Sequence, residues 1–435
     1  MALDETHDPK RKSWVEAANA LGTDFPLQNL PLGIFRRKGV PEAARGGVAI
    51  GDRIVDLAAA HRAAIFSGAA AMAAAAASGA TLNPLMALGN GPTNALRREL
   101  SEMLGSEGSA RRASIEPHLV AMADAELLLP AEIGDFSDFF SSIHHATNAG
   151  RAFRPENPLM PNFKYLPVAY HSRTSSIVPS GTNFRRPKGQ IRRQGSDAPL
   201  LSPSRSLDCE VELGFYIGAG NAMGEPIPIA RAEEHIFGFC LLNDWSARDI
   251  QGWESQPLGP FLGKSFCTTV SPWIVTKAAL EPFRAANEAH AAGDPAPLPH
   301  LAQQGEGGFD IALEALIVTP KSREARGAPM RFALCNARNG YWTVAQMVAH
   351  HTSNGCNLCP GDLLATGTLS GPQPGTLGCL LEITKRGSEA MKLANGEERR
   401  WLEDGDEVIF RARAEKPGAV GIGFGEARGL ILPAA

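Results

Sequence analysis

The 435-residue sequence has little net charge and lacks long runs of one charge or of apolar residues. Its formal net charge is -4, and no basic run forms the clustered positive face that phosphate binding needs, which argues against a nucleic-acid partner. No apolar stretch is long enough to span a bilayer, which argues against a membrane partner. The first residues lack the apolar core of a signal peptide, so we expect a cytoplasmic protein.

Cysteine is scarce and scattered, which excludes a disulfide framework. The seven cysteines include one C-x-x-C motif, formed by Cys356 and Cys359. No second cysteine pair and no histidine pair follows at zinc-finger spacing. We therefore expect these cysteines to pack inside a reduced protein rather than to bind zinc or carry redox chemistry.

The length of the chain and its 44% apolar residues allow two domains, and its texture changes near residue 125. Residues 1–125 offer strand-like runs at 47–50 and 53–57, joined by the turn signal Gly51-Asp52, and an alanine-rich helix at 69–77. These residues carry little chemistry, so a structural role is expected. Residues 126–435 form the second predicted domain.

In this second part, Gly, Pro, Thr and Ser recur between short apolar runs, as is typical of a β-rich domain. We predict strands at 177–179, 207–217, 273–276, 309–318, 379–383 and 407–411. We predict helices at 136–145, 232–237, 247–253 and 344–351, and surface excursions at 285–308 and 321–329. The expected class is mostly β with some helix (α+β).

The strand at 207–217 is the most informative segment, because side chains alternate between its two faces. One face is apolar and comprises Cys209, Val211, Leu213, Phe215 and Ile217. The other carries Asp208, Glu210 and Glu212, whose charges repel unless water or a cation neutralises them. This face is either a solvated surface or part of a cation site.

Further polar side chains follow along the chain. Asp244, Arg248 and Gln251 have the spacing of one helical face, although Asp244 could also be a plain helix N-cap. Lys264 and Thr268 lie among glycine and apolar residues, and a buried lysine needs an anionic partner.

A histidine and two acids suggest a general base. Asp138 and His145 would share a face of the predicted helix at 136–145, although this segment alone favours a capped helix with a satisfied histidine. Glu382 is a lone acid among apolar residues, and His145 is its proposed partner. Ligands that are all oxygen suit Mg²⁺ or Ca²⁺.

These clusters, in this order, resemble the fumarylacetoacetate hydrolase family along nearly the whole chain. The runs that carry the resemblance are HATN (145–148), LMPN (159–162), RRPKGQ (185–190), GEPIPI (224–229), NDWSARDIQ (243–251), PLGPFLGKSF (257–266), NGCNL (354–358) and IGFG (422–425). The resemblance implies an N-terminal SH3-like barrel, a catalytic β-sandwich roll and a homodimer. It also implies a metal-dependent hydrolase that cleaves a carbon–carbon bond of fumarylacetoacetate, giving fumarate and acetoacetate in the last step of tyrosine and phenylalanine breakdown.

The resemblance also implies roles for individual residues. His145 would be the catalytic base, Glu382 would orient it, and Arg248, Gln251 and Lys264 would stabilise the oxyanion. The remaining roles fall on metal residues (Asp138, Glu210, Glu212 and Asp244, with Lys264 and Thr268 beside a second cation) and on substrate contacts (Arg154, Tyr170, Gln251, Thr368, and the positions of Phe140 and Ser255).

Two of these positions depart from the family, which usually has tyrosine where this chain has Phe140 and Ser255. The departures keep open a related acylpyruvate or other diketo-acid hydrolase. A 2-keto acid decarboxylase or isomerase of the same fold is a further alternative, against which the presence of both His145 and Glu382 argues. A catalytically inactive scaffold is a third, against which the complete set of acids argues.

Overall fold

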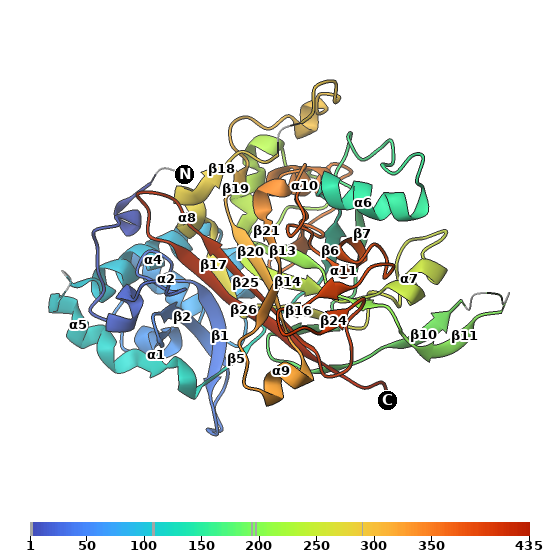
Figure 1. The fold of residues 1–435 in the computed structure, drawn as a ribbon. Coiled ribbons are helices and arrows are strands. Elements are labelled where there is room, and N and C mark those ends of the chain that lie inside the picture. The colour runs from blue at the N-terminus through green and yellow to red at the C-terminus, as the bar shows by residue number, and fades with distance from the viewer. Residues whose placement is uncertain (1–2, 107–108, 193–194, 196–197, 289) are drawn as a thin grey trace.

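The computed structural model describes residues 3–106, 109–192, 195, 198–288 and 290–435. Figure 1 shows the N-terminal part of the chain on one side of the molecule, beside a larger part built from the later strands. Both parts contain helices and strands, which confirms the predicted mixed α+β class. No helix of the described residues is long and apolar enough to cross a membrane.

The N-terminal part combines short strands with a helical layer. The predicted turn at Gly51-Asp52 joins two of the strands, and the predicted alanine-rich helix is present as α2. The elements are β1 (Leu32–Arg37), β2 (Arg45–Ile50), β3 (Arg53–Asp56), β4 (Leu119–Ala121), β5 (Ala125–Leu128), α1 (Leu57–Arg62), α2 (Gly68–Ala76), α3 (Asn83–Ala87), α4 (Asn90–Leu104) and α5 (Ser109–Ile115). The described strands follow the open order β4-β3-β2-β1, and β5 pairs with the other edge of β1, so the SH3-like barrel that the resemblance implies does not close.

One sheet continues from the N-terminal strands into the rest of the molecule, because β1 pairs with β17. Its later strands follow the order β17 (Trp273–Thr276), β14 (Ile236–Asp244), β13 (Val211–Ile217), β22 (Leu363–Ala365), β6 (Phe136–Phe139) and β7 (Ala169–His171). The domain boundary between residues 125 and 126 stays a prediction, and β5 spans it.

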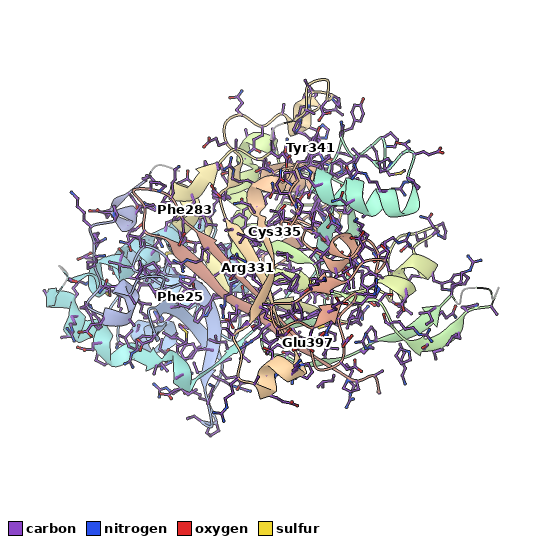
Figure 2. The ribbon with its side chains drawn as sticks, in the orientation of Figure 1. Phe25, Phe283, Arg331, Cys335, Tyr341 and Glu397 are labelled. Carbon is purple, nitrogen blue, oxygen red and sulfur yellow. The ribbon has the colours of Figure 1, made fainter. Side chains whose placement is uncertain are left out.

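A second sheet packs on the first through contacts of β25 and β26 with β14. Its order is β21 (Met330–Asn336), β20 (Ala312–Val318), β25 (Glu407–Ala414), β26 (Ile422–Leu432) and β9 (Phe184–Arg185). Arg331 and Cys335, labelled in Figure 2, mark the two faces of the edge strand β21: Cys335 is buried in the core, whereas Arg331 is exposed. The edge strand β21 therefore has one face on the core and one in solvent, whereas Leu316, Val318 and Ile409 form a small buried cluster on the outer face of its neighbours β20 and β25.

The strands β13 and β14 are buried on both faces. Phe239 and Leu241 of β14 pack in the core between the two sheets, whereas Cys240 and Leu242 pack in the core shared with the N-terminal part. The five apolar residues predicted to share one face of the 207–217 segment all lie in the first of these cores. β13, which begins at the acidic residues, and β14, which ends at Asp244, are thus held rigidly from both sides.

Four predicted elements were wrong. Residues 136–139 form the strand β6, which pairs with β22 and β7, and the helix α6 begins only at Ile143, where Ser142 caps it. Residues 380–383 are a helical turn, α11, and the predicted helix at 232–237 is the 3-10 helix η6 (Ile229–His235). The predicted excursion at 321–329 begins within α9, which Thr319 caps.

The remaining elements connect or flank the two sheets. The helices are α6 (Ile143–Phe153), α7 (Arg248–Glu254), α8 (Lys277–Leu280), α9 (Pro320–Glu324), α10 (Val344–Thr352) and α11 (Leu380–Ile383). The strands are β8 (Ile177–Pro179), β10 (Lys188–Ile191), β11 (Leu200–Pro203), β12 (Leu207–Asp208), β15 (Ser246–Ala247), β16 (Thr268–Val270), β18 (Arg284–Ala285), β19 (Gly308–Phe309), β23 (Met391–Lys392) and β24 (Glu398–Arg399). Short 3-10 turns at 5–7, 16–19, 116–118, 122–124, 281–283, 299–301 and 337–339 complete the order.

Candidate active site

Four carboxylates meet where the central strands end. Asp138 lies on β6, Glu210 directly precedes β13, Glu212 lies on β13 and Asp244 is the last residue of β14. Each offers an oxygen within 4.8 Å of the others, and all four side chains are buried. The solvated strand face that the sequence left open is therefore excluded, because Asp208, Glu210 and Glu212 are all buried.

Several oxygens of this cluster are unpaired. Within the described residues, both carboxylate oxygens of Glu212 and Oδ1 of Asp138 are buried without a hydrogen-bond partner. Burial, and next the charge of Asp244, raises the pKa of Asp138, while burial and the charge of Asp138 raise that of Glu212. Buried, unpaired oxygens of this kind fit a hard divalent cation such as Mg²⁺ or Ca²⁺.

Lys264 supplies the positive charge inside the cluster. Its Nζ donates to Glu210 Oε2 and, at 2.5 Å, to Asp244 Oδ2, while Thr268 Oγ1 donates to Asp244 Oδ1 at 3.1 Å. Burial alone would lower the pKa of Lys264, but Asp244 and Glu210 raise it above its usual value. The predicted anionic partner of Lys264 is confirmed.

Arg248 borders the cluster from the first turn of α7. Its Nη2 lies 2.7 Å from Glu210 Oε1, and its Nη1 donates to Gln251 Oε1 at 3.1 Å. Nη2 also lies 2.9 Å from Asp208 Oδ2, so the guanidinium is paired with two buried carboxylates. The expectation that Asp244 shares a helical face with Arg248 and Gln251 was wrong, because Asp244 ends a strand and α7 begins at Arg248.

A histidine–carboxylate pair lies beside the acids. His145 Nδ1 is 2.7 Å from Glu382 Oε2, which confirms the predicted pairing. Burial raises the pKa of Glu382, but the charge and hydrogen bond of His145 and the hydroxyl of Ser370 lower it to about 2. Because an ionised carboxylate only accepts, Nδ1 carries the hydrogen and Nε2 is left as the basic nitrogen.

Backbone pairing connects this pair to the acidic cluster. Cys379, which precedes the helix that carries Glu382, forms a β-bridge with Glu210. Its thiol is 3.1 Å from Glu382 Oε2, and its burial raises the pKa of that thiol. His145 also helps Lys264 and Arg248 to lower the pKa of Glu210 against the effect of burial. The two groups of residues form one continuous site.

The residues expected to contact substrate differ in their burial and in their partners. Tyr170 donates its hydroxyl to Asp244 Oδ2 at 3.1 Å, and Thr368 Oγ1 is buried without a partner in the described part of the chain. The ring of Phe140 packs edge-on to His145 at 5.1 Å. Arg154 is exposed, and its guanidinium reaches only the Pro158 carbonyl at 3.5 Å among its described contacts.

Ser255 makes its hydrogen bond with α7 rather than with the acidic cluster, because its hydroxyl donates to the Gln251 carbonyl at 2.5 Å. Cys356 is half-buried and Cys359 is exposed, so the expectation that this pair packs inside the protein was wrong for Cys359. Neither cysteine joins a possible metal group among the described residues.

Sequence reasoning missed several partners of Glu382. Asn148 Nδ2 donates to Oε1 at 2.9 Å, and Ser370 Oγ donates to Oε2 at 2.7 Å. The contacts of Asp208 with Arg248 and with the Leu380 N–H were also missed, although its place in the row of three acids was a signal. No sequence feature marks Ser370, whereas Asn148 ends the HATN run that carries the family resemblance.

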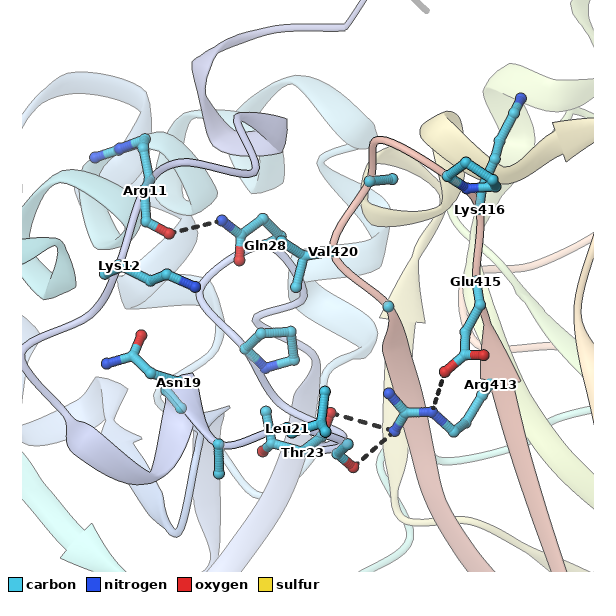
Figure 3. Close-up of a pocket in the computed structure, with 17 residues that line it drawn as sticks. Arg11, Lys12, Asn19, Leu21, Thr23, Gln28, Arg413, Glu415, Lys416 and Val420 are labelled. Carbon is cyan, nitrogen blue, oxygen red and sulfur yellow. Dashed lines mark hydrogen bonds and ion pairs between the residues drawn. The ribbon is translucent and has the colours of Figure 1, made fainter.

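A cavity lies away from these residues, between the N-terminal segment and the β25–β26 connection (Figure 3). It has a volume of ≈ 600 Å³, and none of the four clustered carboxylates Asp138, Glu210, Glu212 and Asp244 lines it. Arg413 spans it, with hydrogen bonds to the carbonyls of Gly22 and Thr23 and an ion pair with Glu415 at 3.0 Å. Its central guanidinium is therefore already satisfied, as expected of a seam between packed segments.

Known proteins resemble this chain over nearly its full length. The sequence profile of the fumarylacetoacetate (FAA) hydrolase C-terminal family matches residues 136–429, and that of the fumarylacetoacetase N-terminal family matches residues 28–130. The fumarylacetoacetase of Oryza sativa subsp. japonica is 48% identical over 97% of this chain and 97% of its own length. That of Homo sapiens is 46% identical over 95% and 97%.

A solved structure supports the fold. The fumarylacetoacetate hydrolase of the psychrophilic Exiguobacterium antarcticum covers 93% of this chain and 99% of its own, with a TM-score of 0.51 and 18% identity. The fumarylacetoacetase relatives, which align over nearly the whole chain, define the protein as a hydrolase that acts on carbon–carbon bonds. The chain belongs to the fumarylacetoacetate hydrolase family.

Proposed function

We propose that this protein hydrolyses a carbon–carbon bond of fumarylacetoacetate and releases fumarate and acetoacetate, the last step of tyrosine and phenylalanine breakdown. The observation that carries the proposal is the convergence of unpaired buried carboxylates with the His145–Glu382 pair. Relatives named fumarylacetoacetase, which align over nearly the whole chain, support the choice of substrate.

The proposed metal residues are Asp138, Glu210, Glu212 and Asp244, with Lys264 and Thr268 beside a second cation. The all-oxygen donor set and its unpaired oxygens support Mg²⁺ or Ca²⁺. A divalent cation supplies Lewis acidity toward the diketo oxygens of the substrate when it is bound.

His145 is the proposed general base. Glu382 holds the Nδ1 hydrogen, so Nε2 takes a proton from the attacking water and the resulting hydroxide adds to the substrate carbonyl carbon. When the carbon–carbon bond breaks, the same nitrogen returns the proton to the leaving carbon. Glu382 keeps the imidazole oriented throughout, and its lowered pKa keeps it ionised.

Arg248, Gln251 and Lys264 are the proposed oxyanion group. Lys264 stays protonated, because Asp244 and Glu210 raise its pKa despite burial. Arg248, whose Nη2 lies 2.7 Å from Glu210 Oε1, places a second positive charge at the edge of the acidic cluster. Gln251 accepts from Arg248 through Oε1, which leaves its amide nitrogen for the substrate.

Substrate contacts are proposed for Tyr170, Thr368, Gln251 and Arg154. Thr368 supports this role with a buried, unpartnered hydroxyl, and Tyr170 with its contact to the acidic cluster. Arg154 would anchor a substrate carboxylate from its exposed position. Phe140, packed against His145, would provide an apolar wall.

Product analysis tests the proposal. Purified protein supplied with Mg²⁺ or Ca²⁺ is expected to convert fumarylacetoacetate into equal amounts of fumarate and acetoacetate. Consumption of the substrate without fumarate, or no consumption under either ion, would contradict it.

A second candidate is an acylpyruvate or related diketo-acid hydrolase. Phe140 has no phenolic hydroxyl, and the Ser255 hydroxyl is already bonded to the Gln251 carbonyl, so two substrate contacts expected from the family are missing. A higher kcat/KM for a short acylpyruvate than for fumarylacetoacetate would favour this candidate.

We further propose a cytoplasmic homodimer, as the family resemblance implies. Exposed apolar side chains at Leu258, Phe261 and Leu262 are compatible with a protein–protein contact. Light scattering on the purified protein is expected to give twice the chain mass of 46.2 kDa.

A further inference from the structure

Asp208 is a buried carboxylate that the proposed reaction leaves unused. It is 0% exposed and lies on β12, two residues before Glu210. It does not belong to the group of four acids that can share a cation. Its two oxygens are fully engaged, unlike those of Glu212.

One set of contacts joins Asp208 to the start of α11. Oδ1 accepts the backbone N–H of Leu380 at 2.7 Å, and Oδ2 accepts that of Leu381 at 2.9 Å. Glu382 is the next residue of this short helix. The carboxylate of Asp208 thus fixes the backbone from which Glu382 reaches His145.

A second set joins Asp208 to Arg248. Oδ2 accepts from Nε at 2.9 Å, and Nη2 lies at the same distance from that oxygen. The side chain of Arg248 is 8% exposed, so this ion pair is shielded from solvent. The same guanidinium extends to Gln251 and Glu210.

We propose that Asp208 is a positioning residue that sets, through one carboxylate, both the orientation of the His145–Glu382 pair and the place of the Arg248 guanidinium. The assignment rests on the proposed function of these two groups. One buried acid thereby fixes the distance between the group that activates water and the group that stabilises the oxyanion. Such outer contacts hold reacting groups in geometry without touching the substrate.

The chain offers a matched control in its N-terminal part. Asp56 is also buried, accepts from Arg45 Nε at 2.6 Å and accepts the Ala59 N–H at the start of α1 at 2.9 Å. Asp56 therefore makes the same kinds of contact as Asp208 but lies away from the candidate active site. Each of the variants D208N and D56N removes a carboxylate charge that contacts an arginine and a backbone N–H group at the start of a helix.

The test measures kcat, KM and melting temperature of both variants in full-length protein with a divalent cation. We expect D208N to lower kcat by about 10- to 100-fold with little change in KM, the size typical of lost outer contacts. D56N should lower the melting temperature but leave kcat within about twofold. A kcat of D208N as high as that of D56N would overturn the assignment.

Coupling between residues separates positioning from a general loss of packing. If Asp208 acts partly through Glu382, D208N should cost less kcat in an E382Q background than in the wild type. The same reduced cost is expected in an R248A background. An equal cost in all three backgrounds would overturn the inference.

A spectroscopic readout is independent of turnover. The Nδ1 proton of His145, donated to Glu382, should give a downfield ¹H resonance that disappears in H145A. D208N should shift or broaden this resonance, and D56N should not. If D208N does not fold, D208E, which keeps the charge but moves it by one methylene group, is measured in its place with the same expectations.

The same assay separates this inference from the proposed function. A loss of kcat in H145A together with a full kcat in D208N would overturn only the role of Asp208. An unchanged kcat in H145A would overturn the proposed base, and with it the positioning role that depends on that base.

Discussion

Buried charge is arranged differently in the two parts of the molecule. In the N-terminal part, Arg45 contacts the buried Asp56 and the half-buried Glu42, each at 2.6 Å, so the buried acid has a cationic partner. In the candidate active site, Glu212 and Asp138 keep buried oxygens that have no partner within the described residues. Because unpaired buried charge is costly, the first arrangement serves the fold, whereas the second fits a site that could hold a cation.

Removal of the base should have the largest effect. His145→Ala is expected to lower kcat by about 10²- to 10⁴-fold, because Nε2 is the proposed proton acceptor. His61→Ala, at an exposed position of α1, is the control and should keep full activity. Near-full activity of the His145 variant in steady-state kinetics would contradict the role of His145 as the base. It would also remove the functional difference between the candidate active site and the N-terminal part.

The next largest effect concerns stability in the presence of a chelator. Asp56→Asn should lower the free energy of unfolding by about 1–3 kcal/mol, because Arg45 loses the buried one of its two charged partners. Glu212→Gln should leave it unchanged or raise it, since it removes a buried charge that has no partner. Urea unfolding of both variants checks this, and equal losses of stability would contradict the comparison.

The stability that Glu382 contributes to the candidate active site depends on pH. Its pKa is about 2, below the ordinary 4.5, because His145 and its other partners outweigh burial. The unfolded chain therefore binds a proton before the folded one does, so this stabilisation is complete above about pH 4.5 and is lost as the pH falls toward about 2.

The stability difference between wild type and Glu382→Gln should accordingly shrink between about pH 4.5 and about pH 3. Denaturant unfolding at both pH values measures it. Glu389→Gln, at an exposed position, shows the background change. A difference that grows as the pH falls would contradict the assigned direction.

The smallest expected effect is at Phe140. Phe140→Tyr adds a hydroxyl beside His145 and should lower KM for fumarylacetoacetate by roughly 2- to 10-fold, the worth of one hydrogen bond. Parallel kinetics with a short acylpyruvate serve as the control. A larger gain for the acylpyruvate would favour the second candidate function.

Much of the fold could be predicted from local sequence patterns. The strands at 177–179 and 273–276 have the predicted bounds, and the alternation of residues 209–217 identified the face that packs in the core. The failures occurred where distant segments decide the conformation. Residues 136–139 become a strand because β22 and β7 pair with them, and residues 380–383 become helical where Asp208 accepts their N–H groups.

The contacts of the candidate active site could likewise be predicted only in part. The pairing of Glu382 with His145 and the burial of Lys264 among acids could be predicted, because lone polar residues in apolar runs need partners. The contacts of Ser370, Asn148 and Asp208 could not, because they join segments that are far apart in sequence.

Metal removal tests the central claim most directly. Protein treated with a chelator is to be assayed for fumarylacetoacetate turnover and melting temperature, then again after Mg²⁺ or Ca²⁺ is restored, with E212Q alongside. We expect activity to be lost and then recovered, and the ion to raise the melting temperature of the wild type more than that of E212Q. Full turnover after chelation, with no ion changing the melting temperature, would contradict the conclusion that the unpaired carboxylates hold a catalytic cation.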